Sequence, residues 1–254
     1  MAGKVEFIKK AKRKYETLPE VTGYVRAGRD AHLHNSKTMG CGVVEFKGID
    51  LPWTVKYDEY FRCLTGSLTI RARGKKYVMK PGDGIWLPRD TKLTYQAKEK
   101  TSLMFAIYPA DWRGVEKRGG KPAVASHKNK SIKLIRKSKR VFGQFWGPPG
   151  YCKIGRDVDV DISTTLGCGM SRFRNVKFPW TVHYDEYFYG LKGTLIIHVR
   201  GKKYPIKPGD GIWLPAGTPM IYEAGSTEAQ VAYAILPVNW RQVEARKKKK
   251  KKKA

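Results

Sequence analysis

The chain has 254 residues, of which 41% are hydrophobic, and it carries a formal net charge of +29. This length and apolar content suffice for two modest cores, and no apolar run approaches the roughly 18 residues of a membrane helix. The four cysteines lack the paired spacing of zinc or redox sites, and the first residues lack the apolar core of a signal peptide. We therefore expect reduced thiols and a cytoplasmic protein without a membrane span.

Three strongly basic segments hold most of the charge: an N-terminal arm over residues 1–22, a linker over 117–149 and a lysine-rich tail over 246–254. Because like charges repel, we expect these segments to be extended and to bind a polyanion. The cations predicted to make this contact are Lys9, Lys10, Lys12, Arg13, Lys14, Lys133, Arg136, Lys137, Lys139, Arg140, Lys247, Lys248, Lys249 and Lys250.

Between the basic segments lies one module written twice, over residues 23–116 and 150–245. Pro52–Phe61, PWTVKYDEYF, returns 127 positions later as PWTVHYDEYF at Pro179–Phe188. The offset grows by one residue near Ala97–Thr101, which predicts a longer hairpin loop in the second copy. Each copy has the size of a small domain, so we expect two globular domains.

Short β-rich runs separated by turn signals dominate each copy and predict an antiparallel sandwich or barrel. In the first copy the predicted strands are Ser67–Ala72, Lys76–Met79, Ile85–Leu87, Leu93–Gln96 and Leu103–Tyr108. Short helices are expected where the modules end, at Trp112–Lys117 and Trp240–Arg246.

The spacing of Glu59, Gly66 and Pro81-Gly82-Asp83, repeated in the second copy, resembles the two-motif signature of cupins. The YDE triplet, the PGD turn and the closing P-x-[DN]-W-R sequence resemble the ethanolamine-utilisation EutQ-like cupins more closely. The resemblance implies an all-β chain of two cupin-type jelly-roll barrels in tandem, with short helices and basic extensions. Its halves are expected to pack as a pseudo-dimer.

The same resemblance places apolar residues where metal-dependent cupins have histidine ligands, so we expect no metal and no cofactor. These positions are predicted to line the barrel interiors instead: Trp53, Val55 and Leu93 in the first copy, and Trp180, Val182 and Met220 in the second.

Strand alternation puts a tyrosine and a glutamate inside each barrel, Tyr57 with Glu59 and Tyr184 with Glu186. If the protein is an enzyme, a glutamate with a raised pKa beside a phenol is the candidate general acid or base. Alternatively, each pair is a buried hydrogen bond inside a filled barrel.

Other polar residues carry weaker signals. His32 and His34 share one strand face, but the second copy has Asp159 and Asp161 there, so a polar surface is the simpler interpretation than a metal site. His183 lies on the opposite face of its strand from Glu186, so we expect it to contact solvent or an interface and not to be a ligand or catalytic residue. The aspartates from Asp157 to Asp161 could bind a cation or face a basic arm of the same chain.

Two classes of function follow. The favoured one is a non-catalytic structural protein that docks through its basic arms onto an acidic polymer. The polymer we expect first is tubulin in a ciliary or flagellar lattice, and the second is structured RNA, as in a ribosome. Its location would then be cytoskeletal or ciliary, with nuclear or ribosomal sites as alternatives. The other is a cytosolic EutQ-like small-molecule enzyme or metabolite-binding protein.

Overall fold

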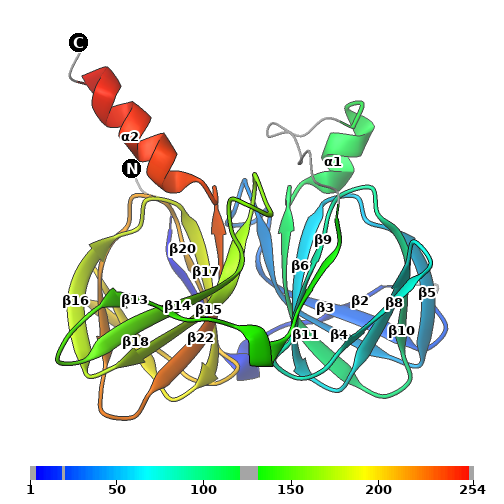
Figure 1. The fold of residues 1–254 in the computed structure, drawn as a ribbon, viewed down its shortest axis with the longest axis horizontal. Helices are drawn as coiled ribbons and strands as arrows, with labels where there is room; N and C mark the ends of the chain where they lie inside the picture. The colour runs from blue at the N-terminus through cyan, green and yellow to red at the C-terminus, as the bar shows by residue number, and fades with distance from the viewer. Residues whose placement is uncertain (1–3, 19–20, 121–130, 252–254) are drawn as a thin grey trace.

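The computed structural model describes residues 4–18, 21–120 and 131–251, and it confirms an all-β fold of two jelly-roll barrels (Figure 1). Each barrel consists of a seven-stranded sheet facing a four-stranded sheet, and the strand pairs are antiparallel. The helices α1 (Trp112–Lys117) and α2 (Trp240–Lys251) project from the same end of the two barrels. Neither of these described helices is long and apolar enough to span a membrane.

The first barrel contains the strands predicted from the first copy. In spatial order its larger sheet is β12 (Lys133–Ile135), β9 (Gly84–Leu87), β6 (Asp58–Thr65), β11 (Thr101–Tyr108), β4 (Gly40–Lys47), β3 (Tyr24–Ala31) and β2 (Glu16–Thr17). Its smaller sheet is β5 (Ile49–Thr54), β10 (Lys92–Ala97), β7 (Leu68–Ala72) and β8 (Lys75–Met79).

The second barrel repeats this arrangement. Its larger sheet is β1 (Glu6–Ile8), β20 (Gly211–Leu214), β17 (Asp185–Lys192), β22 (Ala229–Leu236), β15 (Gly167–Arg174), β14 (Tyr151–Val158) and β13 (Gly143–Trp146). Its smaller sheet is β16 (Val176–Thr181), β21 (Pro219–Ala224), β18 (Leu195–Val199) and β19 (Lys202–Ile206). The loop between β21 and β22 is one residue longer than that between β10 and β11, which confirms the predicted position of the insertion.

The barrels share a third hydrophobic core between them. In β6, Phe61 belongs to the core of the first barrel, whereas Tyr60 points to the shared core with Trp86. Their counterparts Phe188, Tyr187 and Trp213 are divided in the same way in the second half. Because the side chains of a strand alternate between two faces, these central strands are buried on both sides.

The N-terminal basic segment and the basic linker are folded, and each contributes a strand to the barrel that does not follow it in the sequence. We call β1 and β12 the exchanged strands, and the segments that contain them the exchanged segments. Strand β1, from the N-terminal segment, pairs with β20 of the second barrel, and β12, from the linker, pairs with β9 of the first. Phe7 and Leu134 pack against the hydrophobic cores of the barrels that they join. The expectation that these segments are extended tails is therefore wrong, because apolar residues alternate with their cations and complete each larger sheet.

A short 3-10 turn follows each exchanged strand, η1 (Lys10–Lys12) after β1 and η2 (Lys137–Lys139) after β12. The backbone N–H of Lys10 donates to Asp210 at 2.8 Å, and that of Lys137 donates to Asp83 at 2.9 Å. These carboxylates belong to the two PGD turns. The repeat thus includes the basic segments, with the offset of 127 residues unchanged.

Two of the cations predicted to bind a polyanion are buried. The side chains of Arg13 and Arg140 are 3% and 2% exposed and form ion pairs with Asp30 and Asp157. Their guanidinium groups are therefore not available to an external polymer. By contrast, Lys9, Lys12, Lys14 and Lys139 are exposed, and Arg136 pairs with Asp83 at 2.9 Å while Lys133 is half-buried.

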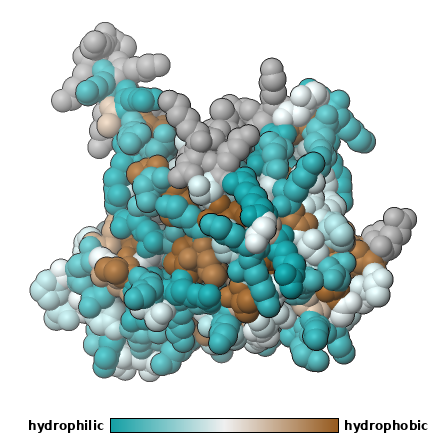
Figure 2. Space-filling model, turned by 45° about the vertical axis from the view of Figure 1, so that its right-hand side comes forward, coloured by the Kyte–Doolittle hydropathy of each residue, from teal (hydrophilic) through white to brown (hydrophobic). Residues whose placement is uncertain are grey.

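In the C-terminal run, Lys249 is exposed on α2, and the side chains of Lys247, Lys248 and Lys250 lie outside the described part. Figure 2 shows a face of the molecule on which hydrophilic residues predominate, with smaller hydrophobic areas between them.

Candidate functional site

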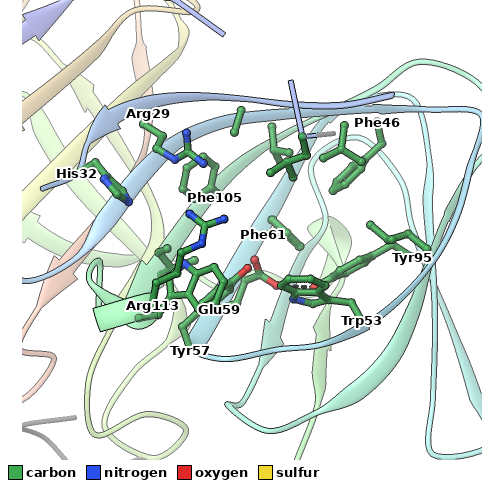
Figure 3. Close-up of a pocket in the computed structure, with 17 residues that line it drawn as sticks. Arg29, His32, Phe46, Trp53, Tyr57, Glu59, Phe61, Tyr95, Phe105 and Arg113 are labelled. Atoms are coloured by element: carbon green, nitrogen blue, oxygen red, sulfur yellow. Dashed lines mark hydrogen bonds between the residues drawn. The ribbon is translucent and has the colours of Figure 1, made fainter. Parts of the chain in front are cut away.

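The first barrel contains a cavity of about 140 Å³ (Figure 3). Most of its wall is apolar and comes from β3, β4, β6 and β11, including Ala27, Phe46, Phe61 and Phe105. One carboxyl group, that of Glu59 on β6, lies among these side chains. A concave apolar space with a few convergent polar groups is the usual form of a small-molecule site.

Glu59 is 4% exposed, and the Tyr95 hydroxyl donates a hydrogen bond to its Oε2 at 2.7 Å. Burial raises the pKa of Glu59 to about 8, since desolvation disfavours the charged form more than the Tyr95 hydrogen bond favours it. At neutral pH this carboxyl is therefore mostly protonated, and it can donate a hydrogen bond as well as accept one.

Aromatic side chains close one side of the cavity. Trp112, the first residue of α1, meets Trp53 edge-on with ring centroids 6.3 Å apart and Tyr57 with centroids 5.5 Å apart. Burial, and then the proximity of Glu59, raise the pKa of the Tyr57 phenol well above its usual value. Tyr57 therefore stays protonated at neutral pH.

Positive charge gathers at one end of the cavity. Figure 3 shows Arg29, His32 and Arg113 at this end, with Phe46 and Tyr95 at the other. The Arg113 guanidinium lies over the Trp112 ring, 4.6 Å from its centroid, whereas Arg29 pairs with Glu16. Burial and the neighbouring Arg29 lower the pKa of His32, so the arginines carry the charge at neutral pH.

The second barrel keeps the glutamate but has less space. Its cavity is about 60 Å³, and Tyr222 donates to Glu186 at 3.2 Å, while burial raises the pKa of Glu186 to about 8. Larger residues stand at equivalent positions: Ile154 replaces Ala27, Phe145 replaces Leu18 and Tyr233 replaces Phe105. The first barrel is therefore the better candidate for a ligand site.

The predicted site residues divide into two groups. Tyr57, Glu59 and Trp53 line the first cavity, and Tyr184 with Glu186 line the second. The other predicted lining residues are placed in or beside the cores: Val55, Leu93, Val182 and Met220 are buried, and Trp180 packs edge-on against Trp240. Within the described residues, no group of three or more histidine, cysteine or acidic side chains could hold a metal ion.

The remaining predicted polar residues have separate surroundings. His34 lies 3.7 Å from Glu6, and His183 stacks on Trp240 with ring centroids 5.5 Å apart. Asp157 faces the basic segment of its own chain through Arg140, which is one of the two alternatives left open by the sequence. His32 lies at the cavity, whereas His34 does not line it.

Sequence reasoning missed Tyr95, Arg29 and Arg113 as site residues. Tyr95 carried a signal, because it lies two residues after Leu93 on a predicted strand and therefore shares the face predicted to point into the barrel. Its pairing with Glu59 follows from packing across the barrel. Arg113 carried a signal, because the Trp-Arg pair at the module end recurs as Trp240-Arg241. In the structure Trp112 and Arg113 both line the first cavity.

The family model for "Ethanolamine utilisation protein EutQ" matches residues 5–114 and again residues 118–242. Curated relatives named "Acetate kinase EutQ" include one from Escherichia coli strain K12, 31% identical over 145 residues, which are 56% of this chain and 57% of that protein. The relative from Salmonella typhimurium is 30% identical over 148 residues, 58% of this chain and 59% of that protein. The matches thus span less than two thirds of these relatives.

Solved structures share the fold at low sequence identity. A putative glyoxylate-induced protein from Pseudomonas aeruginosa aligns with a TM-score of 0.73 at 14% identity and covers 91% of this chain and 87% of its own. Oxalate decarboxylase from Bacillus subtilis aligns with a TM-score of 0.62 at 13% identity, over 92% of this chain and 76% of its own. A cupin 2 conserved barrel protein from Leptotrichia buccalis has a TM-score of 0.55 at 16% identity, over 84% and 88%.

Proposed function

Because this chain belongs to the ethanolamine utilisation EutQ family, we propose that it is a small-molecule protein of that type whose first barrel binds a small carboxylate. The observation that carries the proposal is the buried carboxyl of Glu59 in an otherwise apolar cavity of about 140 Å³, with arginines at one end. The relatives are named acetate kinases, so acetate is the first carboxylate to test.

The electrostatics of the cavity suit such an anion. A protonated Glu59 does not repel a carboxylate and can donate a hydrogen bond to it. The Tyr57 phenol, which also stays protonated, offers a second donor on the same wall. Arg113 supplies positive charge at the mouth, and a hydrogen bond from a charged donor is stronger than one between neutral groups.

The size of the cavity restricts the ligand. About 140 Å³ accommodates a molecule of a few non-hydrogen atoms, and the apolar wall around Phe61 and Phe105 suits a methyl or short alkyl group. A larger metabolite would require α1 to move, because Trp112 and Arg113 contribute to the cavity mouth.

The test is isothermal titration calorimetry with acetate on the full chain, and the repeat supplies matched controls. We expect Glu59→Leu and Arg113→Gln each to weaken acetate binding by about tenfold or more, since Glu59→Leu removes the protonated carboxyl that donates to the ligand and Arg113→Gln removes the positive charge at the cavity. Glu186→Leu and Arg241→Gln make the same changes in the second barrel and should leave the affinity unchanged. Absence of acetate binding, or equal losses in both barrels, would overturn the proposal.

A turnover assay with ATP and acetate then separates a binding protein from a kinase. If the chain transfers a phosphoryl group, Glu59→Leu should reduce the rate and Glu186→Leu should not. Absence of turnover in a protein that binds acetate would assign it to the binding class.

Docking onto an acidic polymer remains a second proposal for the exposed part of the basic segments. It is supported by the exposed side chains of Lys9, Lys12, Lys14 and Lys139 and by the lysine-rich helix α2. Co-sedimentation with microtubules, with and without nuclease and with residues 247–253 deleted, tests it. Binding should weaken steeply with salt, and nuclease-sensitive recovery would favour RNA over tubulin.

A further inference from the structure

A cleft of about 410 Å³ lies between the two barrels, where the two exchanged segments meet. Figure 1 shows the segment after β1 (blue) and the segment after β12 (green) between the two barrels, at the lower edge of the view. Of the described residues that line the cleft, five are cations, Lys10, Arg62, Lys137, Arg140 and Arg172, and none is a carboxylate. It is separate from the cavity that contains Glu59.

Equivalent residues of the two repeats line the cleft. Lys10 and Lys137 are equivalent residues, and both contribute to it. Their alkyl chains run over Gly209 and Gly82, where a Cβ atom would come within 2.5 and 2.6 Å of the respective lysine Cδ. These glycines, with φ of +94° in both cases, therefore leave room for the two lysines to reach the same cleft from opposite sides.

The repeat symmetry is broken by a buried arginine. Arg62 stands where the second copy has Tyr189, and its side chain is 5% exposed. Its Nη1 has no hydrogen-bond partner within the described chain and lies 4.0 Å from Asp157 Oδ2. Asp157 is already bound by Arg140, through hydrogen bonds of 2.5 and 2.6 Å.

Two guanidinium groups therefore approach one carboxylate here, whereas in the other half Arg13 is the one guanidinium among the described residues that binds Asp30. Arg172 adds a further cation: it lies over the Phe142 ring, 4.0 Å from the centroid, and its Nε has no hydrogen-bond partner among the described residues. Arg62 and Arg140 thus share the single carboxylate of Asp157, and a bound anion would reduce the cost of burying this excess positive charge.

We propose that this cleft is a second ligand site, which binds a compact, multiply charged anion of the oligophosphate class. Paired guanidinium and ammonium groups are the usual partners of phosphate oxygens in proteins. The equivalent lysines Lys10 and Lys137, one from each exchanged segment, suit a ligand with phosphate groups at both ends, and Arg62 and Arg172 line the same cleft.

The test is calorimetric titration of the full chain with inorganic tripolyphosphate at physiological salt. We expect one site per chain. The double variant Lys10→Gln/Lys137→Gln, which changes two exposed residues, should weaken binding by about tenfold or more. Arg62→Tyr, which installs the residue of the second copy, should also weaken it, with thermal unfolding measured to show that the variant is folded.

The control is Lys76→Gln/Lys203→Gln, which removes the same charge from exposed, equivalent residues of β8 and β19. It should leave the affinity within about twofold of the unmodified chain. Equal weakening by both double variants would show attraction by net charge and overturn the site. So would binding of several ions per chain, or no saturable binding.

Discussion

The Arg13 guanidinium forms two hydrogen bonds with the Asp30 carboxylate, Nε to Oδ1 at 2.7 Å and Nη2 to Oδ2 at 2.6 Å. Its remaining nitrogen donates to the carbonyl of Gly209 in the second barrel at 2.9 Å. The Tyr187 hydroxyl, also from the second barrel, donates to Asp30 at 2.6 Å. This ion pair therefore joins the N-terminal segment to both halves of the chain.

Removal of one partner of this pair should destabilise the protein strongly. We expect Asp30→Asn to lower the free energy of unfolding by about 3–5 kcal/mol, because it leaves a buried guanidinium without its counterion. Chemical denaturation of the full chain measures this. Lys56→Gln breaks the ion pair between Lys56 and Glu116, whose side chains are 38% and 36% exposed. This substitution should lower the free energy of unfolding by less than about 1 kcal/mol. Similar losses of unfolding free energy in the two variants would contradict a structural role for the Arg13–Asp30 ion pair.

The exchanged strands predict how the chain can be divided. A fragment of residues 23–116 lacks β12 and leaves the shared core uncovered, so we expect it to be insoluble or unfolded. Fragments 4–120 and 131–251 each carry the strand that the other needs, and they should form a folded one-to-one complex when mixed. Analytical ultracentrifugation and circular dichroism measure both outcomes. A stable, monomeric 23–116 fragment would contradict the structural role of β12.

The buried glutamates predict a pH dependence of stability. Burial raises the pKa of both Glu59 and Glu186 to about 8, so the folded state holds protons that the unfolded state has released above about pH 4.5. Stability should therefore fall as the pH rises from about 4.5 to 8, by a few kcal/mol per glutamate. We expect the melting temperature of Glu59→Gln/Glu186→Gln to change less over this range. Parallel pH profiles for variant and unmodified chain would show that these carboxyls are not protonated when folded.

The difference between the two cavities predicts a reciprocal substitution. Ala27→Ile places the larger side chain of the second copy in the first cavity and should reduce acetate affinity by about tenfold or more, with little loss of stability because space is available. Ile154→Ala is the converse change and should enlarge the second cavity at a cost of about 0.5–3 kcal/mol, since Ile154 is only partly buried. Calorimetry and thermal unfolding measure these effects. Unchanged acetate affinity in Ala27→Ile would place the ligand elsewhere.

Much of the fold could be predicted because the repeat and the strand period are local properties of the sequence. Strands β7 to β11 and helix α1 lie where alternation and turn residues indicated, and the parity of Tyr57, Glu59 and Phe61 directed these side chains into the barrel. The replacement of the expected histidine ligands by Trp53, Val55 and Leu93 is likewise visible in the sequence alone.

The tertiary structure decided where the basic segments go and what faces Glu59. Runs of charge suggested extended tails, but the strands that contain Phe7 and Leu134 pair with the second and first barrels respectively. Asp30 and Asp157 neutralise Arg13 and Arg140, which follow these strands. These contacts join residues far apart in the chain, so no local pattern could reveal them. The doubled sequence determined two barrels of one design, whereas packing across the barrel and between the copies determined that Tyr95 meets Glu59, that the first cavity is the larger one and that a basic cleft lies between the halves.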